Sequence, residues 1–357
     1  MANKTEADRE KVRAFAMQIL SDIATTLTGA LNYIGDKLGI FKAMAAAGAP
    51  VTVEELARRT GLNARYLREW LGAMTAARYV DYDPAAATYF LPPEHAAVLA
   101  DENNPFFLCG FIQQSVPLAS MAPQVAEAFR TGKGVPQSAY PTELFEAMER
   151  TSAAMYEHQL IRRWLPTMPQ VEEKLKNGGA ALDVGCGSGR AVIALAQAFP
   201  NARISGFDAH AGSVERARAN AKAAGVAERV RFEVVDCTQL PAHEFDFIST
   251  FDVVHDAGDP LGLMTSIRNA LTSDGTYLLL EMNVSPNVNE NINPLGKLMY
   301  GASTLYCLTT SLAQGGAGFG ALMGEPKVRE LAARAGFLSF RRLPIRDPFS
   351  ALFELRP

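Results

Sequence analysis

The segment that most constrains the fold runs from Ala180 to Arg190, where the pattern of a buried strand enters a glycine-rich turn. Its residues read Ala-Ala-Leu-Asp-Val-Gly-Cys-Gly-Ser-Gly-Arg, and a helical pattern follows over 191–199. Glycines in such a turn let a cofactor come close to the backbone. A dinucleotide-binding fingerprint would place its third glycine at position 190, where this chain has Arg190. The G-x-x-x-x-G-K-[ST] pattern of a phosphate loop does not occur either. The turn therefore predicts a cofactor site and disfavours NAD and FAD.

Two acidic residues follow the next two predicted strands. Asp208 ends the run 203–207, 19 residues after Gly189, and Asp236 ends the run 232–235. An acid at the carboxyl end of a parallel strand can hold the two hydroxyls of a ribose, and a second one can accept a hydrogen bond from an adenine amino group. The amide of Cys237 is free to donate to the same ring. Together these residues predict a nucleoside site at the ends of three successive strands.

The chain divides into two parts with different periodicity. Residues 6–177 show mostly helical spacing, whereas from Gly178 onward short apolar runs bounded by Gly, Asp and Pro alternate with helical patterns. The second part therefore predicts βαβ units on a parallel sheet. A chain of 357 residues, 48% of them hydrophobic, is long enough for two domains with separate cores.

The first part contains the order of elements found in a winged helix. The expected elements are a helix over 53–59, a second helix after Asn63, and a hairpin with strands over 79–82 and 88–91. Thr52 and Glu55 form a capping box at the first of these helices. A long helix from Thr142 to just before Pro166 and the segment 106–130 are expected to bridge the two parts.

These motifs together resemble those of class I S-adenosylmethionine-dependent methyltransferases. The matching segments are 182–189 for the first motif, 206–208 for the second, 234–237 for the third, 245–251 for the fourth strand and 270–276 for the turn into the fifth. The resemblance implies an α/β fold with a Rossmann-like sheet of seven strands, the last one antiparallel, after a mostly α-helical winged-helix domain. The first part is similar to the N-terminal domain of plant-type small-molecule O-methyltransferases and their bacterial relatives.

The resemblance also implies domain limits and a cofactor site. A winged-helix dimerisation domain would span 1–110, a helical bridge that contributes to the substrate pocket 111–177, and the methyltransferase domain 178–357. S-adenosylmethionine is the implied cofactor. The residues that would bind it are Gly185, Gly187, Asp208, Asp236, Cys237 and Phe251, the last of which lies against the cofactor in the family.

His255 is the candidate general base, because it follows the fourth predicted strand at the carboxyl edge of the sheet. Methyl transfer to an alcohol or phenol needs a base near the acceptor, and an imidazole with an ordinary pKa is mostly neutral near pH 7. The order histidine, aspartate, two residues and an acid matches the family's catalytic motif, although Ala257 replaces an aromatic residue there. The family also implies Glu281 as the acid that orients the histidine. The alternatives are a structural histidine at a helix start and a solvated strand-end carboxylate.

The insertion 283–324 follows the fifth predicted strand and is rich in Asn, Gly and apolar residues. Insertions of this length often carry function. It is expected as an ordered lid over an apolar acceptor, or as additional core helices with a surface loop, and the two descriptions are compatible. Glu325 follows in the region where the family has a second acid beside its catalytic histidine.

Charge and cysteine content narrow the function further. The net charge is −4, and residues 1–110 hold 11 basic against 13 acidic side chains, so the winged helix attracts phosphates poorly. The four cysteines form no C-x-x-C pair and no histidines have metal-ligand spacing, which predicts reduced thiols and no metal. Residues 1–11 lack the apolar core of a signal sequence, and the apolar runs are shorter than the ~18 to 20 residues that span a bilayer. We therefore expect a cytoplasmic protein without membrane contact.

The sequence thus predicts a metal-independent enzyme that transfers a methyl group from S-adenosylmethionine to an apolar or aromatic small molecule, with oxygen as the acceptor atom. The apolar stretches 23–33 and 38–49 exceed what one small winged helix can bury, which predicts a homodimer through residues 1–110. The alternative is a winged-helix DNA-binding transcriptional regulator that senses S-adenosylmethionine or a metabolite.

Overall fold

A computed structural model describes residues 7–104 and 106–357 and divides the chain into two compact units, Met1–Pro117 and Leu118–Pro357. Of the segment 1–11, in which we expected no signal sequence, residues 1–6 lie outside the described part. Each unit has its own buried apolar core. The two units are therefore described separately.

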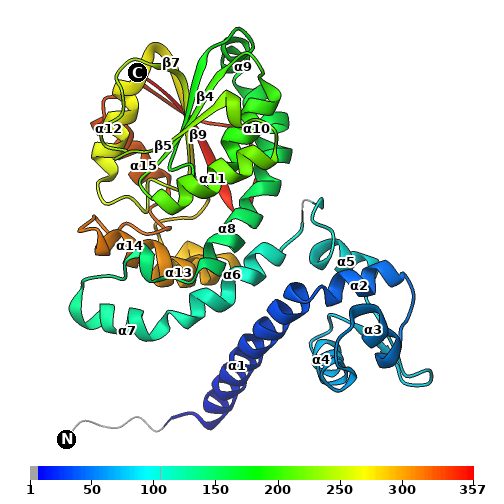
Figure 1. The fold of residues 1–357 in the computed structure, drawn as a ribbon. Helices are drawn as coiled ribbons and strands as arrows, with labels where there is room; N and C mark the ends of the chain where they lie inside the picture. The colour runs from blue at the N-terminus through cyan, green and yellow to red at the C-terminus, as the bar shows by residue number, and fades with distance from the viewer. Residues whose placement is uncertain (1–6, 105) are drawn as a thin grey trace, which may run out of the picture. The chain divides into compact units, whose positions relative to one another are not determined.

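The first unit contains a winged helix, which confirms the predicted order of elements. Its elements are α1 (Arg9–Lys37), α2 (Ile40–Ala47), α3 (Val53–Thr60), α4 (Ala64–Ala76), β1 (Asp81–Asp83), β2 (Thr88–Phe90), α5 (Pro93–Leu99) and the beginning of α6 (Cys109–Ser120) (Figure 1). The hydroxyl of Thr52 accepts a hydrogen bond from the Glu55 amide at 3.2 Å. The side chain of Asn63 caps α4 by accepting hydrogen bonds from the first amides of that helix. Local capping therefore determines where α3 and α4 begin.

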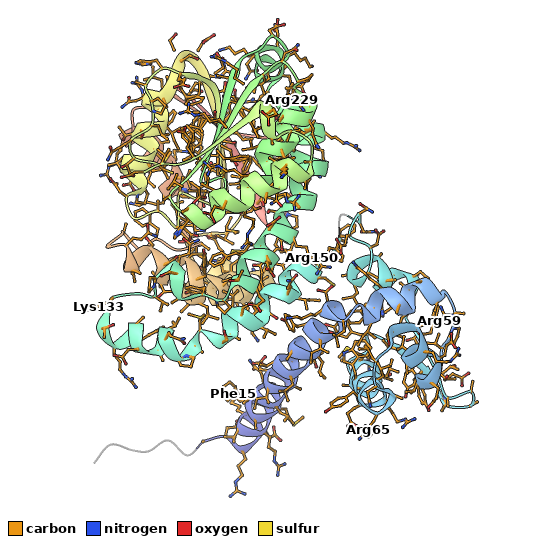
Figure 2. All side chains as sticks on the ribbon, viewed as in Figure 1. Phe15, Arg59, Arg65, Lys133, Arg150 and Arg229 are labelled. Atoms are coloured by element: carbon orange, nitrogen blue, oxygen red, sulfur yellow. The ribbon has the colours of Figure 1, made fainter. Side chains whose placement is uncertain are left out.

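Helix α1 corrects one expectation about membranes. Over 29 residues it is long and apolar enough, by length and composition only, to cross a bilayer. Its apolar side chains are exposed in the single chain, for example Phe15 at 61% and Leu27 at 64% of their surface (Figure 2). A helix with such a surface needs a cover, which a second protein surface provides as well as a membrane does.

The second unit is built on a sheet of seven strands in the order β5-β4-β3-β6-β7-β9-β8. The strands are β3 (Ala180–Val184), β4 (Arg203–Asp208), β5 (Val230–Val234), β6 (Phe245–Phe251), β7 (Leu271–Met282), β8 (Ser339–Arg342) and β9 (Ser350–Arg356). Strands β3 to β7 pair in parallel, whereas β9 is antiparallel to β7 and β8. The last strand of the chain is thus the antiparallel one, which confirms the predicted sheet.

Helices cover both faces of this sheet (Figure 1). Neighbouring residues of β3 point to opposite faces, so Ala181 joins one apolar core and Leu182 the other. The first core contains side chains of α9 (Pro169–Lys176), α10 (Arg190–Ala198) and α11 (Ala211–Ala223). The second contains side chains of α12 (Pro260–Ala270) and α15 (Gly324–Arg334). The parallel strands between these layers all direct their carboxyl ends to one edge.

Two boundaries differ from the predicted ones. Strand β7 begins at Leu271, which pairs with Phe245, so the expected turn 270–276 is largely part of the strand and a register shift absorbs the irregularity. The expected long helix is α8 (Thr142–Met155) followed by a π-helical segment, Tyr156–Trp164, and a 3₁₀ turn, Leu165–Thr167. Periodicity could not reveal the π-helical segment because its apolar spacing is close to that of an α-helix.

The insertion 283–324 forms ordered helices. They are a 3₁₀ turn Val288–Asn291, α13 (Pro294–Ala302), a π-helical segment Ser303–Cys307 and α14 (Leu308–Ala313). Tyr306 and Cys307 share a buried cluster with Tyr140 and with Leu144 of α8, and Val125 of α7 (Ala122–Thr131) belongs to it. The insertion therefore adds a small core of its own to the second unit.

Candidate active site

The glycine-rich turn joins β3 to α10, and its three glycines differ in their surroundings. Gly185, Gly187 and Gly189 all have positive φ angles, of 70°, 52° and 76°. A Cβ atom at Gly185 would lie 2.7 Å from a methyl carbon of Val253, and one at Gly189 would lie 2.7 Å from the Phe232 ring. A Cβ at Gly187 would meet no atom within 4 Å. Gly185 and Gly189 are thus required by packing, whereas Gly187 borders open space that a ligand can enter.

Asp208 ends β4 and is bonded directly to this turn. Its Oδ2 accepts a hydrogen bond from the Gly187 amide at 2.9 Å, and its Oδ1 accepts one from the His210 amide at 2.8 Å. Burial raises the pKa of the Asp208 carboxyl, while the two amides oppose that shift. The turn and the acid, predicted from separate motifs, therefore lie at one point of the sheet edge.

Asp236 does not end a strand as expected. Strand β5 stops at Val234, and the exposed Asp236 accepts hydrogen bonds from the Thr238 amide at 3.0 Å and the Thr238 hydroxyl at 2.7 Å. These bonds lower the pKa of the Asp236 carboxyl. The neighbouring Cys237 is half-buried, and burial raises the pKa of its thiol to about 11. A part for either residue in binding adenine stays a prediction.

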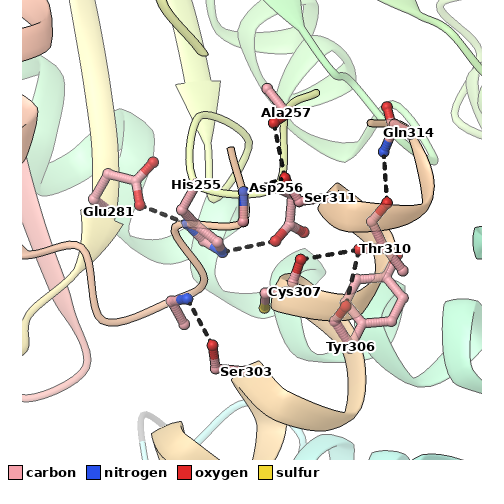
Figure 3. Close-up of polar contacts among 12 residues, drawn as sticks. His255, Asp256, Ala257, Glu281, Ser303, Tyr306, Cys307, Thr310, Ser311 and Gln314 are labelled. Atoms are coloured by element: carbon pink, nitrogen blue, oxygen red, sulfur yellow. Dashed lines mark hydrogen bonds and ion pairs between the residues drawn. The ribbon is translucent and has the colours of Figure 1, made fainter. Parts of the chain in front are cut away.

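His255 and Glu281 form a buried pair at the same edge (Figure 3). The imidazole follows β6 and is 1% exposed, and Glu281 near the end of β7 is 3% exposed. The distance from His255 Nδ1 to Glu281 Oε2 is 2.6 Å, and Nε2 lies 3.2 Å from Oδ1 of Asp256 on the other side of the ring. Glu281 therefore fixes the orientation of the ring, and Nε2 faces Asp256.

The electrostatics of His255 differ from the expectation of an ordinary imidazole. Burial alone lowers the pKa of His255, but the carboxylates of Glu281 and Asp256 outweigh it and raise the pKa well above the ordinary value of 6.5. The two acids therefore favour the positively charged form of the ring. A motif cannot reveal this shift, because it depends on how deeply the three groups are buried together.

Asp252 is a candidate functional residue that sequence reasoning missed. It directly follows Phe251 in an unusual backbone conformation with φ of 57°, and it is not glycine. Its Oδ1 is buried and has no hydrogen-bond partner within the described part of the chain. Burial raises the pKa of its carboxyl to about 7. Strain and an unsatisfied acid at one residue are typical of functional sites, and the available signal was its place at a strand end.

Cys307 of the insertion reaches the same site. Its Sγ, a nitrogen of His255 and an oxygen of Asp256 all lie within 4.8 Å of one another, and so do ligand-type atoms of Asp252, His255 and Glu281. Burial raises the pKa of the Cys307 thiol to about 12, so it is protonated. The spacing of histidines along the chain gave no sign of these groups, because their members come from distant segments. The absence of a metal therefore stays a prediction.

The structure gives the neighbours of Phe251 and Glu325, and contact of Phe251 with the cofactor stays a prediction. The Phe251 ring lies 4.8 Å from Tyr156 and 5.9 Å from Trp164, both in the π-helical segment after α8. Glu325, at the start of α15, forms ion pairs with Arg329 at 2.8 Å and Arg342 at 2.9 Å. Its two carboxylate oxygens are occupied by these arginines rather than by His255.

Two family models match the chain at the places where the structure has its two units. Residues 26–101 match the Rv2258c-like winged HTH domain, and residues 175–336 match a methyltransferase domain. The chain carries a winged helix followed by a methyltransferase domain. Its fold is that of the class I enzymes that use S-adenosylmethionine.

Known proteins with related sequences or folds agree with this assignment. The O-methyltransferase pgmB of Aspergillus terreus is 25% identical over 243 residues, which cover 62% of this chain and 54% of that protein. A candidate O-methyltransferase from Nostoc punctiforme PCC 73102 superimposes with a TM-score of 0.72 at 20% identity, covering 96% of this chain and 98% of that one. Human N-acetylserotonin methyltransferase, solved with S-adenosylmethionine, gives 0.65 at 18% identity, covering 100% and 99%. This chain spans about a fifth of the first two curated relatives it matches.

The methyltransferase domain implies S-adenosylmethionine as the cofactor, and the residues at the sheet edge fit it. Gly187 offers open space beside the backbone, and Asp208 places a carboxylate next to that space. In the described residues, Oδ1 of Asp252 and Oε1 of Glu281 are buried acceptors without hydrogen-bond partners. Such carboxylates suit a cofactor that carries a sulfonium and an amino group, both positively charged.

Proposed function

We propose that this protein transfers a methyl group from S-adenosylmethionine to the oxygen of an apolar or aromatic small molecule. The observation that carries the proposal is the buried pair of His255 and Glu281, 2.6 Å apart, at the sheet edge that holds the glycine-rich turn. S-adenosylmethionine supplies an activated methyl group on sulfur. The protein then has two tasks, which are to hold the acceptor in line and to take its proton.

The general base in this proposal is Nε2 of His255. Nδ1–H of the neutral ring donates a hydrogen bond to Glu281, so that the lone pair of Nε2 is presented to an acceptor hydroxyl. When the proton is transferred, the carboxylates of Glu281 and Asp256 stabilise the imidazolium that forms. Since the negative charges of those carboxylates also favour the protonated ring before an acceptor binds, the neutral ring becomes common only at higher pH or beside another positive charge.

The acceptor is proposed to be apolar because of what surrounds His255. Cys307 lies beside His255 and Asp256, and it belongs to the buried cluster with Tyr140, Leu144 and Tyr306. The Tyr140 and Tyr306 rings contact each other edge to face with centroids 5.0 Å apart. We propose the part of the bridge that lies in the second unit, 118–177, and the insertion as the walls and lid of the acceptor pocket, since both contribute to this cluster.

Regulation of transcription is the competing function, and the charges of the winged helix argue against it. The arginines of α3 and α4 each have a carboxylate partner, as Arg59 with Glu55 at 2.6 Å and Arg68 with Glu54 at 2.9 Å illustrate. Figure 2 shows Arg59 and Arg65 on these two helices. Paired arginines contribute little to the neutralisation of phosphates that dominates DNA affinity. We propose instead that this domain forms a homodimer and that the enzyme acts in the cytoplasm.

The proposal is tested by incubating the protein with methyl-labelled S-adenosylmethionine and a cytoplasmic small-molecule extract. We expect label in an apolar product, and we expect the rate to survive dialysis against a chelator because no step of the proposal uses a metal. Loss of the rate on dialysis, restored by one divalent cation, would refute the metal-independent mechanism. Binding of duplex DNA that weakens steeply with salt, together with no labelled product, would support the regulator instead.

A further inference from the structure

Glu149 on α8 contacts the end of the glycine-rich turn. Its Oε1 accepts hydrogen bonds from Nε and Nη2 of Arg190, at 3.0 and 2.6 Å, and Arg190 is the first residue of α10. A second guanidinium, that of Arg216 on α11, lies 3.8 Å from Oε2. The Glu149 side chain is only 15% exposed, so these pairs are less screened than surface ion pairs. Arg190 stands where a dinucleotide fingerprint would have its third glycine. Here its guanidinium is the hydrogen-bond partner of Glu149.

Asn220 gives Glu149 a second connection to the turn. Its Nδ2 donates to Glu149 Oε1 at 2.9 Å and to the backbone oxygen of Ser188 at 3.0 Å. Ser188 lies between Gly187, which borders open space, and Gly189. The turn is therefore held on one side by Asp208 and on the other by Glu149, through Arg190 and Asn220.

The same helix also borders the proposed acceptor pocket. Leu144 of α8 is fully buried in the cluster with Tyr306 and Cys307, and Cys307 lies beside His255. Leu144 and Glu149 are five residues apart on one α-helix, a rise of about 7.5 Å. Because a helix moves as a rigid element, a displacement at one of these residues is transmitted to the other.

We propose that Glu149 is a positioning residue that fastens α8 to the cofactor-binding turn, so that cofactor binding also orders the wall of the acceptor pocket. The inference rests on the proposed function, since it takes the turn as the cofactor site. It assigns Glu149 no contact with substrate. Its effect passes through Arg190, Asn220 and the turn.

The test uses S-adenosylhomocysteine as the probe, because it binds the cofactor site without needing an acceptor. Calorimetry on Glu149→Ala should show affinity reduced about fivefold or more, the lower end of coupling between linked sites. Glu149→Gln keeps an oxygen for Arg190 and Asn220 but loses the charge, so its affinity should be intermediate. The control is Glu146→Ala, which removes an exposed carboxylate from the same helix and should bind like the wild type.

A second readout separates coupling from mere loss of stability. In the wild type and in Glu146→Ala, S-adenosylhomocysteine should slow hydrogen exchange of the α8 amides, residues 142–155. In Glu149→Ala the slowing should be absent even at saturating probe. If Glu149→Ala does not fold, Glu149→Gln carries the same comparison.

Each outcome decides one question. Wild-type affinity and wild-type protection of α8 in a folded Glu149→Ala or Glu149→Gln protein would overturn the inference and leave the proposed function intact. A wild-type protein that does not bind S-adenosylhomocysteine at all would contradict the proposed function itself. Reduced affinity with lost protection, confined to the Glu149 variants, supports the positioning role.

Discussion

His255 lies between the carboxylates of Glu281 and Asp256, and this arrangement determines the pH range in which its ring can accept a proton. In the proposed mechanism, the two acids that strengthen His255 as a base also favour its protonated form before an acceptor binds. A histidine with an ordinary pKa would be a weaker base that is available at lower pH. We therefore expect the pH profile of the reaction to be displaced to higher pH.

We expect kcat/KM to rise with pH through an apparent pKa above 6.5. The sign follows because only neutral His255 can accept the proton, and its pKa is raised. Glu281→Gln removes the nearer charge, so the rising limb should move to lower pH while kcat falls. A wild-type limb at or below 6.5, or the same limb in both proteins, would show that His255 is not the titrating group.

Asp208 should contribute to cofactor affinity. Asp208→Asn keeps the shape of the side chain but replaces one acceptor oxygen, which would leave the Gly187 amide or a ribose hydroxyl without its partner. The expected loss is about 1 to 3 kcal/mol in calorimetry with S-adenosylhomocysteine. Asp274→Asn, an exposed acid in the first part of β7, serves as the matched control. Equal affinity of the two variants would remove Asp208 from the cofactor site.

The residues predicted from sequence are those whose role follows from local pattern. A strand end or a sequence motif was enough to predict four of them, Gly187, Asp208, His255 and Glu281. The structure brings these four residues to one edge of the sheet. Asp252, Cys307 and Glu149 could not be assigned in this way. Cys307 and Glu149 have partners more than 25 residues away in the chain, and the raised pKa of Asp252 comes first from its burial. Neither long-range contacts nor burial can be derived from a local pattern.

The glycine-rich turn shows how one element depends on its neighbours. Gly189 is the N-cap of α10 and has a positive φ, and the Phe232 ring and Ala217 occupy the space where its side chain would be. Strand β5 and helix α11 therefore both pack against the turn. The sequence predicted the turn, the strand before it and the helix after it. It did not reveal that packing against Phe232 and Ala217 requires a glycine at position 189.

Gly189→Ala should destabilise the protein and distort the turn. Its Cβ would lie 2.7 Å from the Phe232 ring, in a backbone conformation that L-residues rarely adopt. We expect a loss of about 1 to 3 kcal/mol in the free energy of unfolding, measured with urea. Gly212→Ala in α11 is the control, since its Cβ would meet nothing within 4 Å and alanine favours a helix. Unchanged stability of Gly189→Ala would mean that the turn adapts easily.

The sequence predicted the presence of helices and strands more reliably than the residues at which they end. It did not distinguish π-helical from α-helical segments. The capping residues Thr52 and Asn63 located α3 and α4, because side-chain capping is a local interaction. The π-helical segments Tyr156–Trp164 and Ser303–Cys307 were missed, since their form depends on packing at the site. The end of β5 differs by one residue from the expected one, since the strand stops at Val234 rather than Val235.

At the scale of the whole molecule, the exposed apolar surface of α1 requires an explanation. Ile23 at 54% and Leu27 at 64% exposure lie on a helix of 29 residues whose surface is open in the single chain. A symmetric copy of the chain is the commonest cover for such a surface. This agrees with the homodimer proposed for residues 1–110.

Light scattering should therefore give twice the mass of one chain at micromolar concentration. Leu27→Glu places a charge on the apolar surface of α1 and should shift the equilibrium to the monomer, while Thr28→Glu on the same turn is the control. A monomeric wild type that binds lipid vesicles would indicate that a membrane covers α1. A monomer that binds no vesicles would leave the apolar face unexplained and reject the dimer.

The central claim, that His255 accepts the proton of the methyl acceptor, is tested most directly by the turnover of His255→Ala on the acceptor identified with the labelled cofactor. The account predicts that kcat falls about 10²- to 10⁴-fold, while the affinity for S-adenosylhomocysteine stays within about twofold of the wild type because the turn and Asp208 are untouched. Turnover at the wild-type rate would contradict the account. The acceptor would then need no base at this position, and the resemblance to O-methyltransferases would extend to the fold and the cofactor alone.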